Sequence, residues 1–85
     1  MSQAELDEKP LRWRCRRGML ELDVILLPFL EQHFKHLSSV EKNIFAEMLE
    51  QADPDLFNWL MGYQVPEKKA FAALVEYIRS VMEQR

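Results

Sequence analysis

The chain has 85 residues, of which 48% are hydrophobic and 29% charged, and its net charge is −3. At this length folding buries only about 60 to 65% of the unfolded surface, so we expect a single domain over 1–85, with a frayed N-terminus at 1–9. Residues 21–62 carry two lysines against eight Asp and Glu side chains, and this acidic middle argues against a chain that wraps a nucleic acid backbone.

The first predicted helix is short and rich in arginine. Pro10 suits the first position of a helix, where its missing N–H is no loss, and Gly18 can adopt the positive φ that ends one. We therefore expect a helix from Leu11 to Gly18. It contains the basic cluster Arg12-Trp13-Arg14-Cys15-Arg16-Arg17.

The second predicted helix runs from Met19 to Leu37 and contains a proline. Its apolar stripe has helical spacing and comprises Leu22, Ile25, Leu26, Phe29, His33 and Leu37. Because Pro28 removes a backbone hydrogen bond and clashes with the preceding turn, we expect a kink near Val24–Pro28 or a break into two pieces.

Three more helices are predicted after residue 37. Ser38 and Glu41 have the spacing of a capping box, which predicts the start of the third. Asp53 as N-cap, followed by Pro54, predicts a short fourth helix that ends at Gly62. Pro66-Glu67 opens the last helix, whose apolar stripe is Phe71, Leu74, Val75, Ile78, Val81 and Met82.

The predicted elements define the fold class. No window alternates with the period of two that marks a strand, and loops of only two to six residues separate the helices. We therefore predict an all-α, small single-domain bundle of about five helices, with neighbouring helices antiparallel or strongly angled.

The cysteine content and the N-terminal sequence indicate a reducing compartment. Cys15 is the single cysteine, and a disulfide-stapled secreted scaffold needs several. Residues 1–8 are acidic and polar, unlike a secretory signal or a mitochondrial presequence. No apolar run approaches the roughly 20 residues of a membrane span. We expect a bacterial cytoplasmic protein without membrane insertion.

Catalytic and cofactor sites are disfavoured. With Gly18 and Gly62 as the only glycines, neither a dinucleotide-binding fingerprint nor a P-loop can be formed. His33 and His36 could supply at most two metal ligands. Cys15 could be activated by its basic neighbours, but we expect a half-buried packing residue. The sequence therefore predicts no enzyme and no metal or cofactor bound stably by this chain.

Arg17-Gly18-x-x-Glu21 is the most unusual motif. One interpretation is structural: Gly18 forms a turn, and Glu21 in the first turn of the next helix pairs with Arg17. The other is functional: a glycine that admits a partner's backbone, flanked by both signs of charge, suits a docking site. The neighbouring Arg14, Arg16 and Trp13 extend that site, since Trp and Arg are enriched at interface hot spots. Stacking of Arg14 or Arg17 on the Trp13 ring would explain the same residues without a partner.

Two blocks of the sequence carry a resemblance. Arg17-Gly18-Met19-Leu20-Glu21-Leu22-Asp23, with Pro28-Phe29, and then Asp53-Pro54-Asp55-Leu56-Phe57-Asn58-Trp59-Leu60 resemble the small assembly factors that promote covalent flavin attachment to the flavoprotein subunit of succinate dehydrogenase. The resemblance covers about residues 11 to 80. It implies a five-helix bundle in which Arg17, Gly18 and Glu21 face the flavoprotein. It also implies that the flavoprotein's own histidine forms the bond to FAD.

The sequence thus predicts a non-enzymatic assembly factor, monomeric when free, that binds the flavoprotein subunit of succinate dehydrogenase or fumarate reductase. Its predicted partner-binding residues are Trp13, Arg14, Arg16, Arg17, Gly18, Glu21 and Asp23. The FAD would belong to the partner. One alternative is a general protein-interaction module, such as an antitoxin-like regulator that uses the same arginine face. A third interpretation, RNA or DNA binding by the Arg12–Arg17 cluster, is disfavoured by the acidic middle.

Overall fold

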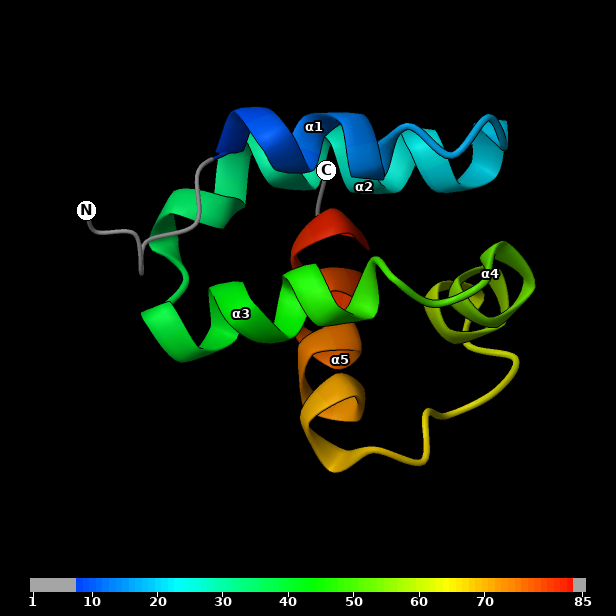
Figure 1. Cartoon of the computed structure of the whole chain (residues 1–85). Coiled ribbons are helices and arrows are strands. Elements are labelled where there is room, and N and C mark those ends of the chain that lie inside the picture. Colours follow the sequence, from blue (N-terminus) through cyan, green and yellow to red (C-terminus); the bar gives the residue numbers. More distant parts are fainter. Residues whose placement is uncertain (1–7, 84–85) are drawn as a thin grey trace.

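The computed structural model describes residues 8–83, which form five α-helices and one 3₁₀ turn (Figure 1). In chain order these are α1 (Glu8–Cys15), α2 (Leu20–His33), the 3₁₀ turn η1 (Phe34–His36), α3 (Ser39–Met48), α4 (Asp53–Met61) and α5 (Lys69–Glu83). No strand occurs among the described residues, so the predicted all-α fold class is confirmed. Of the N-terminus expected to fray, 1–7 lie outside the described residues, whereas Glu8 and Lys9 already belong to α1.

The helices pack in two directions. In Figure 1, α1 and α2 lie side by side, α3 runs in a similar direction below them, and α5 crosses this set steeply. By contact, α2 packs on α1, α4 and α5, and α5 packs on α2, α3 and α4. The turn between α1 and α2 lies at one corner of the bundle, at the same end as α4.

The core is centred on two phenylalanines. The ring of Phe29 on α2 lies 5.5 Å from that of Phe45 on α3 and 6.0 Å from that of Tyr77 on α5, between ring centroids. Phe34 of η1 adds a further ring 5.7 Å from Phe45. Aromatic pairs of this geometry stabilise by about 0.5 to 1.5 kcal/mol beyond the area they bury. The core thus joins α2, η1, α3 and α5 around one aromatic cluster.

Two of the predicted helix ends are confirmed. Ser38 Oγ accepts the backbone N–H of Glu41 at 3.1 Å, and Glu41 Oε1 accepts the backbone N–H of Ser38 at 2.8 Å, which is a complete capping box. Gly62 ends α4 with a φ of +83°, a conformation in which a Cβ would be strained.

Other boundaries differ from the prediction. The first helix ends at Cys15 rather than at Gly18, and the last begins at Lys69, after a connection in which Pro66 is buried. The helix expected to reach Leu37 ends at His33, because the chain tightens into η1 and Leu37 is already extended.

Pro28 does not break α2. The helix is continuous from Leu20 to His33, and Leu26, Phe29 and Leu30 are fully buried around the proline. Since a proline removes only one helical hydrogen bond, packing on both sides of it is sufficient to keep the helix intact.

No helix in the described part of the chain is both long enough and apolar enough to cross a membrane.

Candidate functional site

Two of the three arginines that precede the unusual motif, Arg12 and Arg14, form ion pairs within the chain. Arg12 Nη1 lies 2.9 Å from Glu31 Oε2 on α2, and Arg14 Nη2 lies 3.2 Å from Glu50 Oε2 after α3. Exposed pairs of this kind contribute at most about 1 kcal/mol each, but they offset the basic charge locally. Since Arg14 is one of these paired residues, the cluster is less of a free basic face than the sequence predicted.

Arg17 has the most extensive set of contacts. Its Nε donates to Asp53 Oδ1 at 2.7 Å, and its Nη2 donates to the carbonyl of Gln51 at 2.7 Å. Its Nη1 donates to the carbonyls of Leu49 at 2.6 Å and Arg14 at 2.9 Å. Only 14% of the Arg17 side chain is exposed. The guanidinium therefore binds the α1–α2 turn to the connection between α3 and α4.

The predicted pairing of Arg17 with Glu21 is wrong. The carboxylate that pairs with Arg17 belongs to Asp53, 36 positions along the chain. Asp53 was predicted as the N-cap of α4, but Ala52 occupies that position and Asp53 is the first helical residue. One contact explains why both predictions are wrong. The Arg17 guanidinium, coming from the α1–α2 turn, pairs with the Asp53 carboxylate, so this carboxylate is not used to cap α4.

Gly18 lies at the exposed tip of the α1–α2 turn. Its φ is +79°, which favours glycine, and a Cβ built there would have no atom within 4 Å beyond its chain neighbours. Asp23 holds this turn from α2, because its Oδ1 accepts the backbone N–H of Arg17 at 2.9 Å. Gly18 therefore gives open access to the backbone, whereas Asp23 is a structural support of the turn.

Trp13, Arg16 and Glu21 are the predicted residues that face outward without a partner. Trp13 is 76% exposed, and within the described residues no Arg14 or Arg17 guanidinium stacks on its ring. The side chains of Arg16 and Glu21 form no ion pair or hydrogen bond with any described residue. One cation, one anion and one large aromatic side chain are thus available near the turn.

Sequence reasoning missed two apolar residues of this region. Leu20 is 73% exposed and Val24 is 51% exposed, and they lie one turn apart on the outward side of α2. A signal was present: the stripe Leu22–Leu26–Phe29 fills the core face of α2, so leucine and valine at positions 20 and 24 must lie on another face. We call the set Trp13, Arg16, Gly18, Leu20, Glu21 and Val24 the α1–α2 corner.

Cys15 lies behind the corner, in the core. Its side chain is fully buried, so it is a packing residue, more completely enclosed than predicted. Burial raises the pKa of the Cys15 thiol from 9.0 to about 12, although the charges of Arg17 and Arg12 oppose the shift. The thiol is therefore protonated at neutral pH and is not an accessible nucleophile.

The histidines are placed separately. His33 stacks on Phe29 with 5.6 Å between ring centroids, and His36 is exposed in η1. Among residues 8–83 no three His, Cys, Asp or Glu side chains are grouped as metal ligands.

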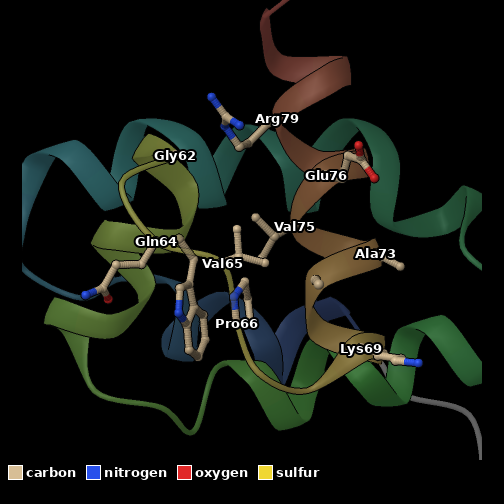
Figure 2. Close-up of a pocket in the computed structure, with 11 residues that line it drawn as sticks. Gly62, Gln64, Val65, Pro66, Lys69, Ala73, Val75, Glu76 and Arg79 are labelled. Atoms are coloured by element: carbon tan, nitrogen blue, oxygen red, sulfur yellow. The ribbon is translucent and has the colours of Figure 1, made fainter.

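A hollow lies between α5 and the connection that precedes it. It has a volume of about 430 Å³, and Figure 2 shows Val65 and Val75 pointing toward one another inside it, with Glu76 and Arg79 at its rim. Trp59 forms another wall. The Trp59 ring packs on that of Phe71, with 5.9 Å between ring centroids, but the side chain stays partly exposed to the hollow. Nothing in the lining points to one particular ligand.

Comparison with known proteins relates the chain to one family. A family model described as the flavinator of succinate dehydrogenase matches residues 9–82. An FAD assembly factor SdhE of Coxiella burnetii is 45% identical over 76 residues, covering 89% of this chain and 93% of the relative. The SdhE protein of Haemophilus ducreyi is 44% identical over 80 residues, covering 94% and 98%. That of Vibrio vulnificus is 50% identical over 68 residues, covering 80% and 79%.

Proposed function

The chain belongs to the family of succinate dehydrogenase flavinators, and on that premise we propose that it is an assembly factor that binds the flavoprotein subunit of succinate dehydrogenase and promotes covalent attachment of FAD. The observation that carries the proposal is the family match over residues 9–82, because it spans α1 to α5 nearly end to end. The similar lengths of the chain and its SdhE relatives support a shared activity.

The α1–α2 corner is the surface we assign to the flavoprotein. Its apolar side chains, Trp13, Leu20 and Val24, are exposed beside charges of both signs, Arg16 and Glu21, that have no ion-pair partner among the described residues. This is the composition of a hydrophobic contact with a polar rim. The open space at Gly18 admits a partner's backbone. Complementary charges at Arg16 and Glu21 would fix the orientation of the complex.

The chain acts by binding and supplies no catalytic group. Affinity for the conformation of the flavoprotein that is ready for flavin attachment raises the population of that conformation. Its one thiol supports this interpretation, since Cys15 is buried and protonated. The FAD belongs to the partner, and the factor is a cytoplasmic monomer when free. The flavoprotein of fumarate reductase is a second client in this proposal.

Covalent flavin in the flavoprotein tests the function. Cells that lack the factor are complemented with this chain, and flavin fluorescence of the succinate dehydrogenase flavoprotein is measured on a denaturing gel. We expect a fluorescent band with the chain and at least tenfold less without it. Equal fluorescence in both cells contradicts the proposal. Co-purification from the same cells distinguishes an antitoxin-like or other interaction module, which would bring down a different partner.

Two variants at Gly18 locate the activity on the corner. Gly18→Arg and Gly18→Ala share the cost of a positive φ, about 1 to 2 kcal/mol, and both should stay folded. Only the arginine adds a long charged side chain in the path of the partner. We expect Gly18→Arg to abolish the fluorescent band and Gly18→Ala to retain most of it. A normal fluorescent band with Gly18→Arg would contradict the assignment of the α1–α2 corner as the surface that binds the flavoprotein.

A further inference from the structure

The contacts of Arg17 separate it from the other residues of its motif. Its guanidinium uses four of its five N–H donors within the chain, on three carbonyls and one carboxylate. The Glu21 side chain, by contrast, is exposed and forms no ion pair or hydrogen bond with any described residue. An arginine that is bound in this way has little left with which to bind a partner.

The acceptors of Arg17 come from distant parts of the chain. The carbonyls of Leu49 and Gln51 lie in the connection that follows α3, and Asp53 is the first residue of α4 at the end of that connection. The carbonyl of Arg14 lies at the end of α1. The backbone N–H of Arg17 is also fixed, by Asp23 of α2. One residue therefore fastens the α1–α2 turn to three other elements.

We propose that Arg17 and Asp53 form a positioning pair for the α1–α2 corner: they hold the turn that presents Gly18 and Glu21, and neither contacts the flavoprotein. This inference rests on the proposed function and assigns a role to each residue within it. Asp53 is needed because the other acceptors of the guanidinium are uncharged carbonyls. Without its carboxylate the guanidinium has no ion-pair partner among the described residues, and only 14% of the Arg17 side chain reaches solvent.

The pair makes a specific prediction for mutants. If Arg17 only positions the turn, loss of Asp53 must weaken partner binding although Asp53 does not touch the partner. If Arg17 instead binds the partner directly, loss of Asp53 frees the guanidinium, and binding is unchanged or improved. Asp53→Asn therefore separates the two roles. Arg17→Lys is the second variant: it keeps the positive charge but lacks the planar guanidinium that makes the four hydrogen bonds.

The matched control is Asp55→Asn. Asp55 lies in the same first turn of α4 and carries the same charge, but it is exposed and makes no ion pair or hydrogen bond with a described residue. Both changes thus remove the same favourable interaction with the helix dipole. A difference between them reports the Arg17 contact alone.

The experiment measures the affinity of each full-length variant for the purified flavoprotein subunit of succinate dehydrogenase from the organism that encodes this chain. Far-UV circular dichroism gives the Tm of each variant, and the affinities are measured at a temperature at which every variant is folded. We expect Asp53→Asn and Arg17→Lys each to bind at least tenfold more weakly than the unmodified chain, and Asp55→Asn within twofold of it. The double variant should bind no more than about threefold more weakly than the worse single variant, since the two residues act as one unit.

Amide hydrogen exchange gives a readout that does not depend on the partner. The amide of Arg17, which donates to Asp23 Oδ1, should exchange at least tenfold faster in Asp53→Asn than in Asp55→Asn. Native affinity of folded Asp53→Asn, or additive losses in the double variant, would overturn the positioning role. If the unmodified chain itself does not bind the flavoprotein, the proposed function fails instead, and the exchange measurement still decides whether the pair holds the turn.

Discussion

At the scale of single residues, sequence reasoning predicted local backbone conformation and exposure, but it assigned wrong roles to the Arg17–Glu21 pair and to Asp53. The positive φ of Gly18 and the exposure of Trp13 could be predicted, because both follow from local chemistry. The partner of Arg17 could not. Spacing along a helix indicated Glu21, four positions away, whereas the actual acceptors are one carboxylate and three carbonyls. Carbonyl positions are set by tertiary packing, which a spacing rule does not contain.

Cys15 gives a prediction for the pH dependence of stability. Because burial raises the pKa of its thiol to about 12, the folded chain disfavours the thiolate that the unfolded chain forms above about pH 9. The contribution is fully present below pH 9 and falls as the pH rises toward 12, by about 1.4 kcal/mol per pH unit. Urea unfolding at pH 8.5 and at pH 10 measures it.

Cys15→Ala is the control for this measurement, since every other titrating group is retained in it. Between pH 8.5 and 10 the native chain should lose about 1 kcal/mol of unfolding free energy more than Cys15→Ala loses. Parallel losses in the two proteins would mean that the thiol titrates normally in the fold.

At the scale of helices, local signals predicted the number of elements and several of their ends. The capping box at Ser38 and the terminal glycine at position 62 depend only on neighbouring residues, so the sequence predicts them. Both are confirmed. The ends at Cys15 and His33 differ from the prediction by three and four residues, because the 3₁₀ turn and the α1–α2 turn depend on packing as well as on propensity.

The capping box can be tested by a pair of adjacent serines. Ser38→Ala removes the side-chain acceptor for the backbone N–H of Glu41 and should cost about 1 kcal/mol. In a chain of this size that lowers Tm by about 4 to 8 °C. Ser39→Ala changes an exposed serine whose side chain makes no hydrogen bond with any described residue, so its Tm should stay within about 2 to 3 °C of the native value. Equal shifts for the two variants would contradict the cap.

At the scale of the whole molecule, the core was predictable and the docking face was predictable only in part. The helical stripe of the second predicted helix identified Leu22, Leu26 and Phe29, which lie in the interior. The exposure of Leu20 and Val24 follows from how α1 and α2 pack, so the apolar part of the α1–α2 corner emerged only with the structure. The hollow beside Trp59, Val65 and Val75 is a second apolar surface. It is the alternative to the α1–α2 corner as the place where a partner could bind.

Amide hydrogen exchange of the full chain, alone and saturated with the flavoprotein subunit of succinate dehydrogenase, shows which surface the flavoprotein covers. We expect binding to slow exchange across residues 16–24 by at least tenfold. Exchange across residues 62–76, around the hollow beside α5, should change by less than twofold. Slowed exchange at residues 62–76 with none at residues 16–24 would contradict the assignment of the α1–α2 corner as the surface that meets the flavoprotein.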